Sequence, residues 1–585
     1  MFKRLLRKQQ MAQGAFAFFS DHRKISILRS LRLASTAHYL PIVNYLIIAL
    51  SCCFLTLTGP HCNGASASQD AKNSLPAKEQ AAQNNHSIKM LACVKCKPLP
   101  TVLNEYVKMV ESIVPEYAST IALLLTGSFG GMNCPGVSSE HAAYIAYFST
   151  DKNFTPLYFF NAQDDAYLVK ILQGLPQAQK SVNSLQPLPS SKIIEDGWKV
   201  FGDTKLINNM KGHWDELMTF LKAPFDTDIQ ARVFLSSLDC KLLLGKELEA
   251  FGKFLLNEIE SVQIDLKHTD NNTLSLIYSN HFTEQSKFIR LFPKRPATTV
   301  TLKLPKSHLQ SDIHSVYLSP YIDLTPLLAK EFIDTLNTII PASIANYFDW
   351  PKIQEMIQSI DTWQKKYAGH MVSTATMVDA KAGNSPCTYF SPVNKLKDAE
   401  LVQFLDDLIN VKLNAFLKSV IPTSGAKKEA NNPPFVCRFD KEVFTYKNKV
   451  VHGCTIAYKL DVLDMLEQLF FTLVNDNLLC ANNRQAMEKF IDECSSKDFS
   501  APVTLSTKAL MDCTINLESI LNSFFSNSTI QKAPEAENYL KIKTIQEAST
   551  LQLQVDLPLS CLSKLTTLLK NQANAGKAPS FKINE

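Results

Sequence analysis

The chain has 585 residues, 45% hydrophobic and 20% charged, which is ordinary for a globular protein and leaves room for more than one core. Its formal net charge of +5 arises in a basic leader, because residues 1–67 hold 8 of the 60 Lys and Arg but one of the 55 Asp and Glu. The remaining residues carry 52 basic and 54 acidic side chains, a net charge of −2, which excludes a general electrostatic basis for binding nucleic acid.

The leader contains the one long, apolar and uncharged stretch of the sequence, which runs from Ile42 to Thr58. Basic residues precede this stretch, and the small-x-small pattern Ala65-Ser66-Ala67 follows it. This order is typical of a secretory signal peptide that is cleaved after the second alanine. We therefore predict an exported protein of the cell envelope, which is periplasmic, held at the cell surface or secreted.

Two other fates of the leader remain open. An uncleaved helix over the same stretch would reach the lower limit for crossing a bilayer and would anchor the chain. Lipid attachment at Cys52 or Cys53 is the other alternative, because the residues before each cysteine approximate a lipobox. We expect membrane contact only through this part of the chain, and we expect residues 68–104 to be a flexible linker, since their first part is polar and has few large apolar side chains.

A CxxC motif, Cys93-Val94-Lys95-Cys96, lies near the end of the expected linker. This spacing lets two sulfurs converge in a redox or zinc site. No second CxxC follows at zinc-finger spacing, so a small local bridge or partners elsewhere are the simpler interpretations. Of the 14 cysteines, 11 lie beyond the leader, and in an oxidising compartment we expect one to three disulfides, with others such as Cys513 buried as small apolar residues.

Residues 105–300 predict a first α+β lobe. Residues 142–149, 156–160 and 198–201 have the apolar, β-branched and aromatic character of strands, and a polar turn and a helical pattern follow the third of them. Residues 371–585 contain a matching passage of strand, polar turn, short strand and helix over 470–491. The glycine-rich turn around Ser128 matches neither a nucleophile elbow nor a phosphate loop.

A second similarity joins the segments around Asp239, Asp323 and Asp512, and we expect each of these carboxylates to cap a helix. Similar strands are expected at 273–278 and 550–555. Such internal similarity predicts a duplicated unit of strand–turn–helix elements, in which mixed or antiparallel sheets carry helices on one face. A mostly helical connector, residues 301–370, would separate the two lobes.

No motif for a metalloprotease, P-loop, dinucleotide or calcium site occurs, so we name no catalytic, cofactor-binding or metal-binding residues. Apolar helices expected at 399–420 and 460–473 would line a groove between the lobes. We therefore expect a non-catalytic binding or structural protein whose partner is a protein or a hydrophobic ligand. The alternatives are a secreted hydrolase with a Ser or Cys beside a His in a cleft, a carrier of a hydrophobic ligand in the groove, and a passive membrane-anchored spacer.

Overall fold

The computed structural model describes a series of segments between Lys89 and Asn574. They comprise residues 89–113, 136–150, 153–164, 190–195, 197–210, 214–235, 256–269, 272–292, 298–318, 323–339, 349–367, 371–375, 387–416, 435–460, 463–518 and 539–574, with the single residues 115, 119, 134, 168 and 254. All of them belong to one compact unit, Asn85–Pro579. The leader, with the stretch from Ile42 to Thr58, lies outside the described residues.

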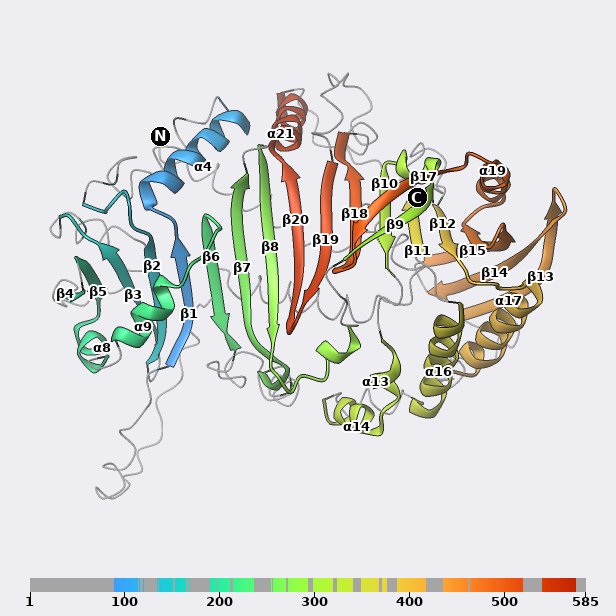
Figure 1. Cartoon of the computed structure of the whole chain (residues 1–585), viewed down its shortest axis with the longest axis horizontal. Helices are drawn as coiled ribbons and strands as arrows, with labels where there is room; N and C mark the ends of the chain where they lie inside the picture. Colours follow the sequence, from blue (N-terminus) through green and yellow to red (C-terminus); the bar gives the residue numbers. More distant parts are fainter. Residues whose placement is uncertain are drawn as a thin grey trace. The chain divides into compact units, whose positions relative to one another are not determined.

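Eighteen of the described strands form one antiparallel sheet, whose middle is visible as the row β7, β8, β20 and β19 (Figure 1). In spatial order its first eight strands are β4 (Ser190–Glu195), β5 (Trp198–Gly202), β3 (Asn153–Asn161), β2 (Ala143–Thr150), β1 (Lys89–Cys96), β6 (Ile229–Phe234), β7 (Ile259–Thr269) and β8 (Thr273–Phe282).

The next ten strands continue from β8. They are β20 (Thr550–Pro558), β19 (Tyr539–Glu547), β18 (Ala509–Asn516), β10 (Ile313–Tyr317), β11 (Met371–Ala375), β12 (Cys387–Pro392), β16 (Asn477–Ala481), β15 (Leu463–Val474), β14 (Lys449–Leu460) and β13 (Phe435–Tyr446). A separate two-stranded sheet pairs β9 (Thr299–Pro305) with β17 (Ser500–Ser506). The protein therefore has an α+β fold with antiparallel sheets.

Tight turns fix the register of several hairpins. Lys447 and Asn448, between β13 and β14, both have positive φ angles of 46° and 62°, as a two-residue type I′ turn requires. Asn475 and Asp476 repeat this geometry between β15 and β16, with φ angles of 49° and 58°. Asparagine and aspartate tolerate such angles better than other non-glycine residues, which explains why polar residues mark these turns in the sequence.

Helices pack on both faces of the sheet, whereas the sequence led us to expect them on one. The described helices that do so are α4 (Leu99–Ile113), α8 (Thr204–Asn209), α9 (Trp214–Lys222), α16 (Trp350–Tyr367), α17 (Asp398–Leu405), the π-helix η3 (Asp406–Leu413) and α19 (Arg484–Ser495). In β3, Phe159 packs with α8 and α9, while the next residue, Phe160, packs with α4. Successive strand residues point to opposite faces, so β3 is covered on both.

The other end of the sheet has the same construction. In β15, Phe470 packs with α19, while Phe471 packs in the cluster of α16, α17 and η3. The strand expected from residue 470 is present in β15. The helix expected at 460–473 is not, because β15 is hydrogen-bonded to β14 and β16 along its length. A strand that is buried on both faces is apolar at consecutive positions, and its periodicity then resembles that of a buried helix.

Two of the expected boundaries shift. Residues 89–104 of the expected linker form β1 and the start of α4, and the alternation of buried and half-buried residues along β1 explains why this short segment joins the sheet. Within residues 301–370, most of β9 and all of β10 are strands, and the described remainder includes α13 (Thr325–Leu328), α14 (Lys330–Ile339) and α16. Residues 68–88 lie outside the described residues.

The strand pairings repeat along the chain. In the first half β1 pairs with β2 and β6, β3 with β2 and β5, β4 with β5, and β7 with β6 and β8. In the second half the same scheme holds when β10, β11, β12, β15, β16, β18, β19 and β20 replace β1 to β8 in order. The hairpin β13–β14 is additional to this scheme, and β8 pairs with its counterpart β20.

Candidate functional site

The four central strands, β7, β8, β20 and β19, separate their side chains into a polar and an apolar face. Residues paired across an antiparallel ladder share a face, so the register assigns each side chain. The central polar face comprises Gln263, Asp265, Lys267, Ser275, Ser279, His281, Lys541, Lys543, Gln552, Gln554 and Asp556, with Ile277 and Ile545 as its apolar members. The central apolar face comprises Val262, Ile264, Leu266, Leu274, Leu276, Tyr278, Leu540, Ile542, Leu551, Leu553, Val555 and Leu557, with His268, Asn280, Thr544 and Gln546 as its polar members.

The central apolar face is incompletely covered. Leu276 is 41% exposed although it lies on a central strand, and its neighbours Leu266, Leu274, Tyr278 and Val555 are half-buried, whereas the row at Leu551 is buried. Leu276 is opposite Leu266 on one side and Val555 on the other, and Val555 is opposite Ile542. This row of apolar side chains crosses four strands and spans about 14 Å, at ~4.8 Å between strands. The described helices cover both faces at the two ends of the sheet, whereas Leu276 at its centre is exposed.

The central polar face is held by hydrogen bonds to carboxylates. The Oδ1 atom of Asp265 accepts from Gln230 Nε2 at 2.9 Å, and its Oδ2 atom accepts from Gln263 Nε2 at 2.7 Å. Asp556 accepts from Ser275 Oγ at 2.6 Å, which links β20 to β8. These bonds satisfy charged groups that are largely buried, and they make this face a rigid support for the apolar side of the same strands.

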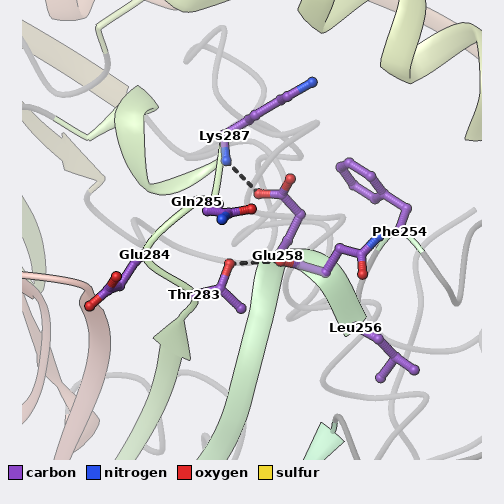
Figure 2. Close-up of a pocket in the computed structure, with 8 residues that line it drawn as sticks. Phe254, Leu256, Glu258, Thr283, Glu284, Gln285 and Lys287 are labelled. Carbon is purple, nitrogen blue, oxygen red and sulfur yellow. Dashed lines mark hydrogen bonds between the residues drawn. The ribbon is translucent and has the colours of Figure 1, made fainter.

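A cavity of about 640 Å³ lies where β7 begins and β8 ends, between Phe254 and Lys287 (Figure 2). Its central acid, Glu258, is buried, and its Oε2 atom accepts hydrogen bonds from Ser286 Oγ at 2.6 Å and from the backbone N–H of Lys287 at 2.6 Å. Figure 2 shows this carboxylate turned toward the backbone of Lys287. The Oε2 atom of Glu258 therefore already accepts hydrogen bonds from the loop at Ser286 and Lys287, which favours a structural role for Glu258.

The CxxC motif lies on β1, so its two sulfurs are on opposite faces of the sheet. Cys93 is 1% exposed and packs with α9, and burial raises the pKa of its thiol to about 11. Burial, together with Asp228, raises the pKa of the Cys96 thiol to about 12. Residues i and i+3 of a strand cannot converge on one metal or form a local bridge without breaking the strand, so these two thiols do not form one redox or zinc site together.

No disulfide joins any two of the described cysteines. They are Cys93, Cys96, Cys134, Cys387, Cys437, Cys454, Cys480, Cys494, Cys513 and Cys561. Cys513 is buried, in agreement with its interpretation as a small apolar residue. The sulfurs of Cys437 and Cys454 are 4.0 Å apart between β13 and β14.

Histidines near hydroxyl or acid groups make only local or structural contacts among the described residues. Ser138 Oγ is 2.9 Å from His141 Nδ1, but the two residues are three apart in sequence and the histidine is exposed. The buried His452 accepts at Nδ1 from the backbone N–H of Glu442, so its Nε2–H donates to Asp398 at 3.0 Å. The two hydrogen bonds of His452 connect the β-bulge at Glu442 in β13 to the start of α17. Ser128 lies outside the described residues.

The three aspartates expected to cap helices have different outcomes. Asp323 Oδ1 accepts from the backbone N–H of Thr325 at 3.0 Å, at the start of α13, which agrees with the prediction. Asp512 lies within β18 and faces Lys543 at 3.5 Å, so the prediction was wrong there, because the strand continues to Asn516. Asp239 lies outside the described residues.

The sequence missed the central apolar face as a site. Its signal was present in the alternation of residues 273–278 and 550–555, which we read as strands, but sequence does not show that these strands pair with each other. Among the described residues, no group of three His, Cys, Asp or Glu side chains could hold a metal ion. None of the described helices is long and apolar enough to cross a membrane.

In comparisons with known proteins, no family model, no curated protein and no solved structure matches the chain.

Proposed function

We propose that this protein is an exported, non-catalytic binding protein of the cell envelope, and that it binds an apolar ligand on the central apolar face. Export rests on the leader sequence, in which a basic segment, an apolar stretch and the Ala65-Ser66-Ala67 pattern follow one another. Binding rests on the exposure of Leu276 in the middle of the sheet. An exposed apolar patch bordered by polar residues is a common mark of a ligand or partner site.

The position of Leu276 favours binding over a merely tolerated surface residue. Single exposed apolar residues are normal on protein surfaces, but this leucine is surrounded by half-buried apolar neighbours on three strands. Charged residues of the same strands lie on the opposite face, at Asp265, Lys543 and Asp556. A ligand that covers the patch would gain the free energy of burying this apolar area, about 25 cal/mol per Å².

A fluorescent apolar probe, N-phenyl-1-naphthylamine, tests the binding proposal. We expect the full-length protein to bind the probe and Leu276→Glu to weaken the binding about tenfold or more, because a carboxylate would be desolvated under the ligand. Val411→Glu is the matched control, since Val411 is 59% exposed on η3, away from the central strands. Equal binding by wild type and Leu276→Glu would contradict the proposal.

Mass spectrometry of the native amino terminus tests export. We expect a chain that begins after Ala67. A lipidated Cys52 or Cys53, or a retained stretch from Ile42 to Thr58, would mean export with an anchor, and an unprocessed chain in the cytosol would overturn the proposal of export.

We also propose that the two halves of the sheet are duplicates of one unit. The repeated pairing scheme supports this, as does the similarity of residues 273–278 and 550–555. When Thr273 is aligned with Thr550, Ile277 corresponds to Gln554, and these two residues are direct partners in the β8–β20 ladder. The ladder is therefore symmetric about a pseudo-twofold axis between them.

A strand exchange tests the duplication. Replacing residues 273–278 by the sequence of 550–555, TLQLQV, should preserve the fold, because each side chain then keeps its face. The same six residues in reverse order, VQLQLT, place the apolar side chains on the polar face and should prevent folding. Circular dichroism and size-exclusion chromatography distinguish the two outcomes. Failure of the TLQLQV exchange together with the reversed one would contradict the equivalence of the strands.

A further inference from the structure

Two buried thiols are in contact across the hairpin of β13 and β14. Cys437 is 3% exposed and Cys454 is 4% exposed, and their sulfur atoms are 4.0 Å apart. Both side chains pack in the cluster of α16, α17 and η3, on one face of the sheet. The two thiols are therefore neighbours in a site that is shielded from water.

The register of the hairpin explains this contact. Cys437 is opposite Ile456 and Cys454 is opposite Phe439, so the two thiols are diagonal neighbours on the same face of the two strands. The right-handed twist of paired strands shortens one of the two diagonals between successive residue pairs, and the sulfur contact places the cysteines on the shorter one. A disulfide has its sulfurs ~2.05 Å apart, so the two atoms need to approach by about 2 Å.

Strand β13 can move by this amount because it is the last described strand of the sheet in spatial order. Among the described strands it pairs with β14 alone, so a small shift toward β14 breaks no second ladder. A β-bulge between Asp440 and Phe444 already interrupts the ladder close to Cys437. Rotation about the Cα–Cβ bonds moves the two sulfurs between staggered positions, which supplies part of the approach.

The contact also makes one of the two thiols the better nucleophile. The S–H group of Cys454 donates to the sulfur of Cys437, and this hydrogen bond lowers the pKa of the Cys437 thiol although burial opposes the effect. Disulfide exchange begins with the attack of a thiolate on a disulfide. Cys437 is therefore the attacking residue, and Cys454 is the residue that completes the bond.

We propose that Cys437 and Cys454 form a disulfide in the exported protein, which links the edge strand β13 covalently to β14. The oxidant is a small-molecule or protein disulfide, for which oxidised glutathione stands as the example. The Cys437 thiolate attacks one sulfur of this oxidant, the S–S bond of the oxidant breaks, and one glutathione thiolate leaves. Cys454 then loses its proton and attacks the Cys437 sulfur of the mixed disulfide, and the second glutathione thiolate leaves.

The electrons and protons of this exchange balance. The two cysteines lose two electrons and two protons, and one oxidised glutathione takes them up to become two molecules of reduced glutathione. The reaction belongs to folding, before α17 and η3 cover the thiols. The inference rests on the proposed export only for the oxidising compartment, since the pairing of the two thiols can be tested with the isolated protein.

The test folds the reduced full-length chain in a mixture of reduced and oxidised glutathione, alkylates the remaining thiols and identifies linked peptides by mass spectrometry. We expect a Cys437–Cys454 link, and alkylation of both residues at least about tenfold lower than in protein folded with reduced glutathione alone. Circular dichroism establishes that the chain is folded. A folded chain in which both thiols are alkylated, or in which either is linked to another cysteine, would overturn the inference.

Variants and urea denaturation give a second measurement. The oxidised wild type should unfold at a higher urea concentration than the reduced protein, because the link restricts the unfolded chain. Cys454→Ala should show no such difference, whereas Cys387→Ala, which removes another buried thiol on β12, should keep it. Equal midpoints for oxidised and reduced wild type would also count against the link. A link that forms in glutathione but is missing from protein taken from cells would contradict the proposed export and not the pairing.

Discussion

The side-chain amide of Asn410 takes the place of a neighbouring strand at the edge of the sheet. Its Oδ1 atom accepts from the backbone N–H of Phe439 at 2.9 Å, and its Nδ2 atom donates to the carbonyl of the same residue at 2.9 Å. One helical turn later, Asn414 Nδ2 donates to the carbonyl of Cys437 at 2.8 Å. The π-helix η3 thereby closes part of the open edge of β13, which would otherwise be a template for pairing with another chain.

Asn410→Asp should destabilise the fold and expose this edge. The carboxylate cannot donate to the Phe439 carbonyl, and it lies beside Asp406, whose Oδ1 atom now accepts from Asn410 at 2.7 Å. We expect a loss of about 1–3 kcal/mol in the free energy of unfolding, measured by urea denaturation. Asn448→Asp, in a turn whose geometry aspartate tolerates, adds the same charge and should leave the stability nearly unchanged. An equal effect of the two variants would contradict the role of Asn410.

The thiols of the CxxC motif should be slow to react while the protein is folded. Burial raises the pKa of both Cys93 and Cys96, so little of either thiolate is present at neutral pH. We expect a thiol reagent such as 5,5′-dithiobis(2-nitrobenzoate) to modify them at least tenfold more slowly in the native state than in urea. A Cys93–Cys96 disulfide in the native protein, detected by peptide mass spectrometry, would contradict their placement on opposite faces of β1.

At the scale of single elements, the sequence predicts strands well where one face is polar. Residues 550–555 alternate, and the structure places them in β20. The helix at the end of the 470–491 passage is also present as α19, because Asn483 is its N-cap and accepts from Ala486 N at 2.7 Å. The prediction failed in β15, where apolar residues face helices on both sides and the period of two disappears.

The short helix α12 (Lys306–Leu309) contains a buried histidine that makes stability depend on pH. His308 stacks on Phe490 with ring centroids 4.9 Å apart, and its Nε2 atom is 3.1 Å from Thr388 Oγ1. Burial, followed by the effect of His314, lowers the pKa of His308 from 6.5 to about 3. The folded state therefore binds a proton less readily than the unfolded state does.

The sign of this effect gives a test. Well above pH 6.5, His308 is neutral in both the folded and the unfolded state, and it then costs no stability. Between pH 6.5 and about 3, the unfolded state gains a proton that the folded state lacks, so the free energy of unfolding decreases as the pH is lowered. The contribution of one proton approaches about 1.4 kcal/mol per pH unit. In urea denaturation from pH 7 to 5, His308→Phe should have a shallower pH dependence than the wild type. His141→Phe, at an exposed histidine, should not, and identical slopes for wild type and His308→Phe would contradict the assignment.

At the scale of the whole molecule, the sequence predicted repeated units but not the continuity of the sheet. The β8–β20 ladder joins Thr273 to Pro558 and His281 to Thr550, residues separated by most of the second half of the chain. No local pattern specifies such a pairing, because an alternating strand can pair with any other that matches its faces. The exposed centre of the apolar face depends on this pairing, so it could not be predicted either.

The ladder should couple the unfolding of the two halves. Trp198 and Trp214 lie in the first half of the sheet with β5 and α9, and Trp350 and Trp363 lie on α16. We expect two variants, each with one of these pairs replaced by phenylalanine, to give single fluorescence transitions that coincide with their own far-UV circular dichroism transitions. A fluorescence midpoint that differs from the circular dichroism midpoint in either variant would show that the halves unfold independently.

The symmetry of the β8–β20 ladder has a consequence for the origin of the chain. A strand edge that pairs with its own counterpart across a twofold axis has the geometry of an isologous subunit interface. On the proposed duplication, a polypeptide of half the present length would expose this self-complementary edge and would assemble as a homodimer. Gene fusion would then have carried the interface inside one polypeptide, where the two copies would be free to diverge, for example at Ile277 and Gln554 on the axis.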